Sequence, residues 1–498
     1  DFEREQLRRE IDARLGGPAC AGGWKCALSF LYPASTAWDA PNVADAAALR
    51  AEDARDAVAP PLPGPGALDV RSGGASGRDV PVASAWRPSP WPASPWPADL
   101  PDIGSNGWAV AGRLMSTGAA LVASDMHLPL GVPPTWYRMR LRIRSGDASM
   151  PGAREPSGPL DLNGLTLPGA PALVAGSNGH VAWAFTNADG KWLDMRPVAC
   201  LSVGDGEMRT PQGTVQLTTA VERIHVRGAA DALLPVRSSP HGLLLESDPA
   251  AHRCWIGSWI AESPAATNMN LLGLERATSV QQVLALAPGI GIPEQNLVVG
   301  DSAGHIGWAI AGRVPTPGAA PHLYDPPIGR VWTANARATD DPAALAAIGG
   351  DDAAVGAQYD LGARARQIRD ALLRLGARAT PLDMLRIQLD IRAVFLARWR
   401  NLMLRLLDGD ATARHPQRAE ARRLVAAWDA RADVGSVGYR LVRAWHDRTE
   451  DAVWGMILRS LGIEAGGPPP QVPPPQQFER PLWMLVSQQP RYLLDGRY

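Results

Sequence analysis

Alternating apolar and polar positions dominate the middle of the chain, from residue 105 to about residue 335. Three hairpin-like units recur there, SNGWAVAG…TGAALVAS, LVAGSNGHVAWAFTN and NLVVGDSAGHIGWAIAG, each with Gly and Asn or Asp near a turn. The segment TVQLTTAVERIHV (214–226) has the same period and predicts one further strand. Between these strands, SVQQVLALAPG (279–289) is typical of a short helix. We therefore expect a large sheet region with inserted helices.

Helical periodicity marks the two flanking regions, residues 1–59 and about 360–465. A helix start is indicated at Thr380, because a capping residue is followed by Pro381 and by the first-turn acid Asp383. The stretch MLRIQLDIRAVFLARWRNLMLRLL (384–407) continues with helical spacing of its apolar residues. The pattern alone supports only a mixed α and β protein with strands followed by helices.

A Pro-rich segment separates the first helical region from the strands. Residues 60–104 contain 11 prolines and include WRPSPWPASPWPADLP (86–101). Such a chain favours polyproline II and cannot build a core, so it is a linker, a spacer or a ligand for an aromatic groove. A non-catalytic interaction protein is therefore one alternative function. The segment GGPPPQVPPPQQ (466–477) predicts a second, shorter loop.

Composition and charge exclude few functions, but they limit the kinds of partner that the protein is expected to bind. The 498 residues are 46% hydrophobic and 20% charged, which suits a globular chain with a large core. The formal net charge of -1 gives no sign of a nucleic acid or an acidic membrane as partner. No apolar run reaches the roughly 18–20 residues of a membrane helix. The chain opens on the charged stretch DFEREQLRREIDARL rather than on a signal peptide, and we expect it to be a fragment.

The four cysteines are Cys20, Cys26, Cys200 and Cys254. None forms a CxxC pair, so a zinc site is not expected. The first two are spaced for a small disulfide loop, which would suit an exported protein, or they are free buried thiols. The sequence leaves the pairing of all four open.

Ser302 lies in Gly300-Asp301-Ser302-Ala303-Gly304, which fits the G-x-S-x-G pattern of the nucleophile elbow of esterases. That motif requires a strand before the serine and a helix after it. The preceding NLVV suits a strand, but the following HIGWAIAG has no helical face. The segment is therefore better interpreted as a hairpin turn, and an esterase that uses Ser302 is the second alternative function.

Ser105 suits a different chemistry, because ordered sequence begins at this residue. If the chain were cut between Gly104 and Ser105, the new α-amine, with a pKa near ~7.7, could act as the base that activates the hydroxyl of the same residue. Gly104 has no side chain to hinder the attack of Ser105 on its carbonyl. The spacer before it leaves the cleavage point accessible. Ser105 is thus a candidate N-terminal nucleophile.

The neighbours of Ser105 carry a family resemblance. GSNGWAVAG and SDMHLPLGVPPTWYRMRL, then LPGAPALVAGSNGHVAWAFTNADGKWLD, IPEQNLVVGDSAGHIGWAIAGRVP, VWTANARA and YDLGARARQIRDALL resemble, in the same order, motifs of the penicillin acylase family of N-terminal-nucleophile hydrolases. This family includes penicillin, cephalosporin and N-acyl-homoserine-lactone acylases. The resemblance covers about residues 105–375. It implies an α+β fold, a four-layer αββα N-terminal-nucleophile hydrolase sandwich with helical additions.

The resemblance also implies roles for individual residues. Ser105 matches the nucleophile, and His127 matches a position near the serine amine. Asn187 matches the residue whose backbone N–H faces the developing oxyanion, and Asn335 matches the side-chain donor to the same oxygen. Arg364 matches an arginine that orients the asparagine and the serine terminus, with Arg366 as the alternative match.

One departure from the family concerns metal ions. Several relatives bind calcium through acids just after the oxyanion strand, whereas this chain has Lys191 where the first acid would be, with Asp189 and Asp194 nearby. A lysine ammonium can replace the charge of the ion. We expect no catalytic metal and no organic cofactor, and a structural calcium ion stays open.

The expected function is hydrolysis of the acyl side-chain amide of a penicillin, cephalosporin or N-acyl-homoserine lactone type substrate. Autocatalytic cleavage at Gly104–Ser105 would leave associated α and β chains. The expected organisation is a helical remnant (1–59), a spacer (60–104) and a β-chain (105–498) with a sheet core (105–360) and a helical region (361–465). The resemblance implies a periplasmic or secreted enzyme whose partners are the small amide substrate and its own two chains, with no nucleic acid or membrane.

Overall fold

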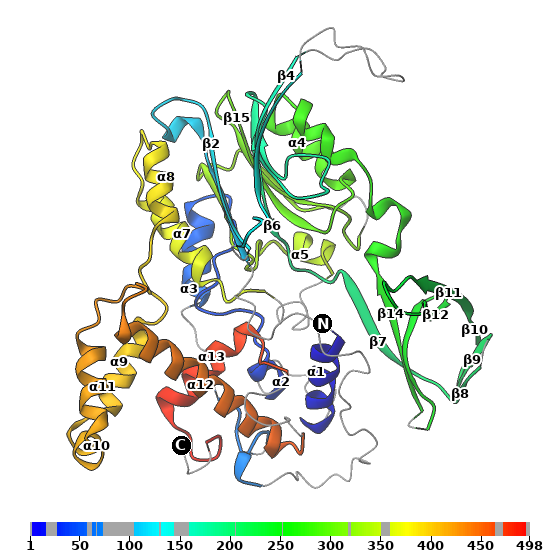
Figure 1. Cartoon of the computed structure of the whole chain (residues 1–498). Coiled ribbons are helices and arrows are strands. Elements are labelled where there is room, and N and C mark those ends of the chain that lie inside the picture. The colour runs from blue at the N-terminus through cyan, green and yellow to red at the C-terminus, as the bar shows by residue number, and fades with distance from the viewer. Residues whose placement is uncertain are drawn as a thin grey trace.

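The computed structural model describes residues 2–15, 27–56, 62–65, 67–72, 104–128, 131–143, 159–204, 206–250, 252–316, 320–349, 359–463 and 472–494. Two antiparallel sheets form its centre (Figure 1). The smaller has the order β18 (Arg330–Thr333), β1 (Gly104–Val110), β2 (Leu121–His127). The larger has the order β17 (His322–Tyr324), β16 (Ile306–Ala311), β15 (Gln295–Asp301), β6 (Val181–Asn187), β5 (Ala175–Ser177), β4 (Leu160–Thr166), β3 (Tyr137–Ile143).

The two sheets pack face to face, and helices cover their outer faces. Alternation along β1 sends Ala109 into the layer between the sheets, with Ala184 and Val298, and sends Trp108 and Val110 to the opposite face. There they meet α7 (Ala363–Arg374) and α8 (Pro381–Gln388). The outer face of the larger sheet is covered by α4 (Val280–Leu286). The order of layers is thus helix, sheet, sheet, helix, as the predicted αββα sandwich requires.

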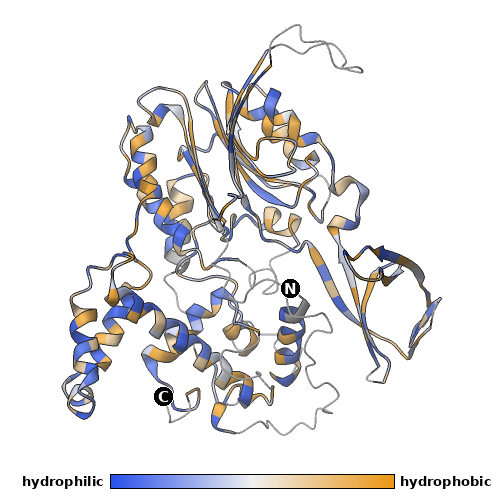
Figure 2. Cartoon of the chain, in the orientation of Figure 1, coloured by the Kyte–Doolittle hydropathy of each residue, from blue (hydrophilic) through white to orange (hydrophobic). Residues whose placement is uncertain are grey.

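Apolar residues on the central strands explain why these layers form. Figure 2 shows that the strands of the larger sheet and α4 carry many hydrophobic residues, whereas α11 (Gln417–Ala426) is largely hydrophilic. The three predicted hairpins are confirmed as the pairs β1–β2, β5–β6 and β15–β16. The short helix at 279–289 is also confirmed, and Ser279 caps it by accepting from the backbone of Gln282.

A second helical layer lies below the sandwich (Figure 1). Its core joins side chains from both ends of the described chain, among them Ile11, Leu31, Trp399, Trp454 and Phe478. The α-helices not yet given bounds are α1 (Phe2–Leu15), α2 (Ala27–Leu31), α3 (Ala46–Asp56), α5 (Pro342–Ala347), α9 (Ala397–Leu406), α10 (Gly409–Arg414), α12 (Val437–Ser460) and α13 (Glu479–Gln488). Within the described ranges, no helix combines the length and the hydropathy needed to cross a membrane.

The segment before the spacer also reaches the smaller sheet. The Asn42 side chain donates from Nδ2 to the backbone O of Trp332 and accepts at Oδ1 from its backbone N, both at 2.9 Å. The indole Nε1 of Trp332 donates to Ala40 O at 2.7 Å. Hydrogen bonds therefore join the segment that precedes the spacer to strand β18, which follows it.

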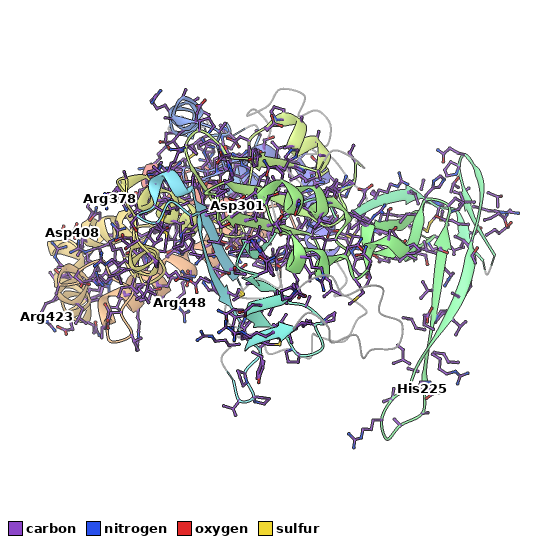
Figure 3. All side chains as sticks on the ribbon, turned by 90° about the horizontal axis from the view of Figure 1, so that it is seen from above. His225, Asp301, Arg378, Asp408, Arg423 and Arg448 are labelled. Carbon is purple, nitrogen blue, oxygen red and sulfur yellow. A yellow bond between two sulfur atoms is a disulfide. The ribbon has the colours of Figure 1, made fainter. Side chains whose placement is uncertain are left out.

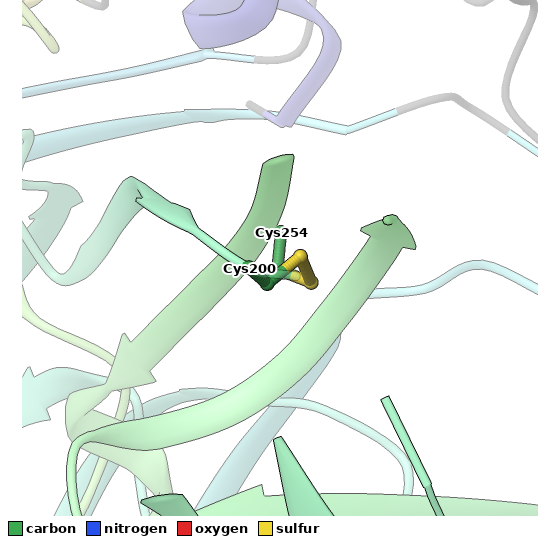
Figure 4. Close-up of a disulfide and its surroundings, with 2 residues drawn as sticks. All are labelled: Cys200 and Cys254. Carbon is green, nitrogen blue, oxygen red and sulfur yellow. A yellow bond between two sulfur atoms is a disulfide. The ribbon is translucent and has the colours of Figure 1, made fainter. Parts of the chain in front are cut away.

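A third sheet projects from the body. Its strands are β11 (Thr218–Ile224), β12 (Ala232–Ser239), β13 (Gly242–Asp248), β14 (Arg253–Trp259) and β7 (Leu193–Ala199), in that order. A small sheet of β10 (Gly213–Gln216), β9 (Glu207–Thr210) and β8 (Ser202–Val203) lies beside it. Figure 3 places His225 at the far end of the projection and Asp301 within the sandwich. The disulfide Cys200–Cys254 joins the end of β7 to β14 (Figure 4). Cys20 and Cys26 lie outside the described residues.

Two predicted elements are interrupted. The single strand expected at 214–226 is wrong, because Leu217 is buried near the disulfide and its N–H donates to Gly206 O at 2.8 Å. This turn separates β10 from β11. The continuous helix expected at 384–407 is also wrong. Residues between α8 and α9 pair with residues 430–432, since Ala393 N donates to Ala430 O at 2.8 Å and Ala432 N donates to Ile391 O at 2.7 Å.

Candidate active site

Ser105 lies in β1, where the backbone is paired on one side and the side chain meets Asn335. The Ser105 N–H donates to Asn335 Oδ1 at 2.6 Å, and Asn335 Nδ2 donates to Ser105 Oγ at 3.2 Å. Both residues are nearly buried, with 9% and 8% of their surface exposed. One side-chain amide therefore contacts both the backbone nitrogen and the hydroxyl oxygen of the serine.

Asn335 reaches Ser105 because the chain turns directly after β18. Its φ of 62° is left-handed, a conformation that asparagine tolerates better than most residues. The same Nδ2 also donates to the backbone O of Asn187 at 3.3 Å. Asn296 Nδ2 donates to that oxygen as well, at 3.0 Å, so the end of β6 is fixed beside Ser105.

Arg364 joins the cluster from the first turn of α7. It donates from Nη1 to Ser105 O at 3.0 Å and to Asn106 Oδ1 at 2.6 Å, and from Nη2 to Asn335 Oδ1 at 3.0 Å. Its guanidinium also pairs with Asp360. Because Asn335 Oδ1 accepts from two donors, the orientation of the Asn335 amide is fixed.

The start of α7 depends on Gly362, which has a φ of 93°. A Cβ at this residue would lie 2.5 Å from Trp38 O. Arg366, the alternative match, turns away from the serine. It donates to Ala37 O and lies 3.6 Å from Asp53 Oδ1. The structure thus brings Arg364, and not Arg366, to Ser105.

His127 lies on the strand next to Ser105, opposite Gly104. Its Nε2 is 3.2 Å from Asp125 Oδ2 and 3.2 Å from Asn106 Nδ2. Alternation places these three side chains on the same face, with Ser105 on the other. In the described part of the chain, His127 has no hydrogen bond to Ser105 and is linked to it through Asn106 and Arg364.

The Asp125 carboxyl is held in its charged form. The hydrogen bond from His127 lowers the pKa of Asp125 most, and Asn106 and the charge of Arg364 lower it further, against the effect of burial. Asn106 and Asp125 were not singled out from the sequence. The predicted hairpin unit ends at Ser124, and continued alternation beyond it would have put Asp125 and His127 on one face, which was the signal that could have found Asp125.

The segment after Asn187 contains Asp189, Lys191 and Asp194, the residues considered above for a metal ion. Burial raises the pKa of Asp189 to about 8, and the charge of Asp360 adds to this effect. Lys191 Nζ instead pairs with Asp194 Oδ1 at 2.8 Å. The described residues contain no group of three or more His, Cys, Asp or Glu side chains arranged to hold a metal.

Ser302 does not occupy a nucleophile elbow. It is an exposed turn residue between β15 and β16, and a strand rather than a helix follows it. The hairpin interpretation of this motif is confirmed. The Trp/Pro tract at 86–101, on which the interaction-protein alternative depends, lies outside the described residues.

A two-sheet sandwich with helices on both outer faces, and a serine at the start of an inner strand, defines the class of N-terminal-nucleophile hydrolase folds. The family model Penicillin amidase matches residues 18–320 and 316–494. The chain therefore belongs to the penicillin amidase family. Its fold is similar to that of a thermostable penicillin G acylase from Alcaligenes faecalis, with a TM-score of 0.57 and 17% identity over 79% of this chain and 74% of that one.

Curated relatives carry acylase names. Penicillin acylase 2 proenzyme from Pseudomonas sp. (strain SE83) is 26% identical over 417 residues, which are 77% of this chain and 49% of the relative. Acyl-homoserine lactone acylase QuiP from Pseudomonas fluorescens (strain Pf0-1) is 29% identical over 216 residues, 42% of this chain and 25% of the relative. The chain thus spans about half or less of the length of these relatives.

Proposed function

We propose that the protein is an amidohydrolase that uses Ser105 as an N-terminal nucleophile after cleavage of the Gly104–Ser105 bond. The observation that carries this proposal is the double contact of Asn335 with Ser105 N and Ser105 Oγ. After cleavage, the nitrogen is the α-amine, so the same amide would orient both the base and the nucleophile. The proposed base and nucleophile then belong to one residue.

In the proposed self-cleavage, Ser105 Oγ attacks the carbonyl carbon of Gly104 and its proton moves to the departing nitrogen of Ser105. The resulting ester is hydrolysed by water, which frees the Gly104 carboxylate and the Ser105 hydroxyl. The surroundings of Gly104 leave little room for a side chain. A Cβ there would lie 3.0 Å from Arg364 Nη2 and 3.2 Å from Asn335 Oδ1. Glycine lets these polar groups stand directly beside the bond that is cut.

In the proposed substrate reaction, Ser105 Oγ attacks the amide carbonyl carbon while the α-amine takes the hydroxyl proton, directly or through a water. Asn335 Nδ2 and the backbone N–H of Asn187 stabilise the negative oxygen of the tetrahedral intermediate. The C–N bond then breaks, and the leaving amine receives the proton. Water attacks the acyl-enzyme, with the α-amine as base, and the acid is released.

The proposed substrate is the acyl side-chain amide of a penicillin, a cephalosporin or an N-acyl-homoserine lactone. The names of the penicillin and acyl-homoserine lactone acylases among the relatives support this class. The protein would act in the periplasm or outside the cell, as an assembly of its own two chains. Neither the proposed self-cleavage nor the proposed hydrolysis of substrate requires an organic cofactor or a catalytic metal.

The test combines intact mass and N-terminal sequencing with amide hydrolysis. The parent chain is expected to yield a new N-terminus reading Ser-Asn-Gly-Trp and to hydrolyse at least one acyl amide from a panel of the three substrate types. Ser105→Ala is expected to stay intact and inactive, whereas Ser302→Ala, the matched control, behaves like the parent. Loss of hydrolysis in Ser302→Ala with retention in Ser105→Ala would overturn the proposal.

A further inference from the structure

Asn106 occupies a junction between α7 and β2. Its Oδ1 accepts from Arg364 Nη1 at 2.6 Å, and since a guanidinium only donates, this contact fixes which end of the amide faces the helix. The other end, Nδ2, then faces Asp125 and His127, at 3.2 Å from Asp125 Oδ2 and from His127 Nε2. Asn106 is 9% exposed, which limits competition from solvent.

His127 Nε2 therefore stands between two groups with opposite requirements. An amide nitrogen can only donate, and a carboxylate can only accept. If Nε2 carries a proton, it donates to Asp125, and Asn106 donates to the same carboxylate. If Nε2 has no proton, it accepts from Asn106 and its lone pair faces the negative oxygen of Asp125. The two arrangements exclude each other.

Electrostatics favours the first arrangement. The hydrogen bond with His127, the Asn106 donor and the charge of the more distant Arg364 all lower the pKa of Asp125 and favour its ionised form. An ionised carboxylate next to an unprotonated Nε2 places two acceptors against each other, which is unfavourable. The negative charge and the fixed Asn106 amide thus act together on the histidine ring.

We infer that Asn106 and Asp125 are positioning residues that hold the proton of neutral His127 on Nε2, so that Nδ1 is the basic nitrogen of the ring. The effect of this tautomer on catalysis rests on the proposed amidase function, whereas the tautomer itself does not. Asn106 also accepts from Arg364, which donates to Ser105 O and to Asn335 Oδ1, so a ring with the other nitrogen protonated would disturb the contacts that place Ser105. Such an effect lowers the rate of the chemical step more than it weakens substrate binding.

The first experiment needs no variant of the positioning residues. Ring ¹⁵N chemical shifts of the ¹⁵N-histidine-labelled parent are measured at a pH where the ring is neutral, and His127→Gln assigns the signal of His127. The expected pattern is a protonated Nε2 with an unprotonated Nδ1. The reverse pattern in the parent would overturn the inference. This measurement stands even if the chain hydrolyses none of the amides tested.

The second experiment removes the acceptor. In Asp125→Ala, the remaining neighbour Asn106 only donates, so the proton of His127 is expected to move to Nδ1. If the parent hydrolyses an amide, kcat should fall roughly tenfold to a hundredfold with KM within about threefold. Asp125→Asn should keep the Nε2–H tautomer and recover most of kcat, because its amide oxygen accepts at the same place.

The matched control is Asp161→Ala. Asp161 also lies on a strand and loses ion pairs, with Arg140 at 2.7 Å and Arg142 at 3.0 Å, but it has no contact with His127. Its kcat should equal that of the parent. Equal losses of kcat in Asp125→Ala and Asp125→Asn, or an unchanged tautomer in Asp125→Ala, would contradict the inference. A parent that is inactive on every amide would count against the proposed function alone.

Discussion

Asn335 and Ser105 share two hydrogen bonds of opposite direction. The asparagine accepts from the serine backbone N at 2.6 Å and donates to the serine Oγ at 3.2 Å. A single side chain therefore holds the backbone N and the Oγ of Ser105, the two atoms that the proposed reaction uses, in one arrangement. Loss of this side chain should affect cleavage of the chain and hydrolysis of substrate together.

Substitution Asn335→Ala should lower kcat by roughly 10²–10³-fold, because a preorganised donor to the oxyanion is removed. Cleavage at Gly104–Ser105 should slow as well. Steady-state kinetics and a time course of chain cleavage would measure the two effects. Asn163→Ala, on strand β4, serves as the control and should match the parent. An Asn335→Ala chain with unchanged kcat would exclude the proposed oxyanion role.

Substitution Arg364→Lys should lower kcat by about tenfold to a hundredfold, because an ammonium cannot reproduce the forked contacts to Ser105 O and Asn335 Oδ1. Arg366→Lys is the control, since Arg366 contacts Ala37 O and Asp53 instead. Kinetics of both variants on the same substrate would decide between them. A larger loss in Arg366→Lys would show that the wrong arginine of α7 has been assigned to the site.

Stability should fall with rising pH because of a buried ion cluster in the helical layer. Burial alone lowers the pKa of His446, but hydrogen bonds from its ring to Asp447 at 2.8 Å and Glu479 at 2.9 Å outweigh this and raise it to about 9. The protonated ring therefore stabilises the fold fully below the unfolded pKa of about 6.5. This contribution declines above that pH and is lost as the pH rises through about 9.

Urea unfolding between pH 6 and pH 9.5 would measure the effect, which should be of the order of 2–3 kcal/mol. The difference in slope between the parent and His446→Gln reports the histidine, because the raised pKa of Asp189 makes stability fall up to about pH 8 in both proteins. His225→Gln is the control, because His225 is an exposed residue paired with Asp231 at 3.0 Å. A parent and a His446→Gln variant with the same pH dependence would refute the assignment.

The disulfide Cys200–Cys254 closes a loop over a sequence separation of 54 residues, within the projecting sheet. Replacing both cysteines by alanine should destabilise this sheet by about 2–4 kcal/mol, because the unfolded segment gains freedom. Hydrogen exchange should show faster opening of β7 and β14, while protection of β1 and β15 stays close to that of the parent. Uniform loss of protection in all four strands would show that the projection and the sandwich unfold together.

The sequence predicted the strands better than it predicted their contacts. Period-two alternation and glycine turns located the hairpins, since these signals are local. The sequence could not predict that Cys200 pairs with Cys254. This pairing depends on the strand register that sets Cys254 opposite Val198, next to the end of β7. The cluster of Asn106 with Arg364 joins residues 258 positions apart and depends on how α7 packs on the sheet. Such packing leaves no periodic trace.

The helix break after Gln388 shows the same limit. The apolar spacing of 384–407 fits a helix throughout, and only a distant partner at 430–432 gives the backbone a better set of hydrogen bonds around Ile391 and Ala393. Tertiary contacts overrode local propensity there. The start of α8 needed no such partner, and its predicted cap at Thr380 is confirmed as a reciprocal capping box with Asp383.

The contacts of Asn42 and Ala40 with Trp332 acquire a different meaning if the backbone is cut at Ser105. Each of the two polypeptides would then hold an incomplete core, because Ile11 and Leu31 pack against Trp399, Trp454 and Phe478 of the other. Neither could melt alone without exposing the apolar surface of its partner. The cut protein should therefore unfold in a single transition whose midpoint rises with protein concentration, as in an obligate heterodimer.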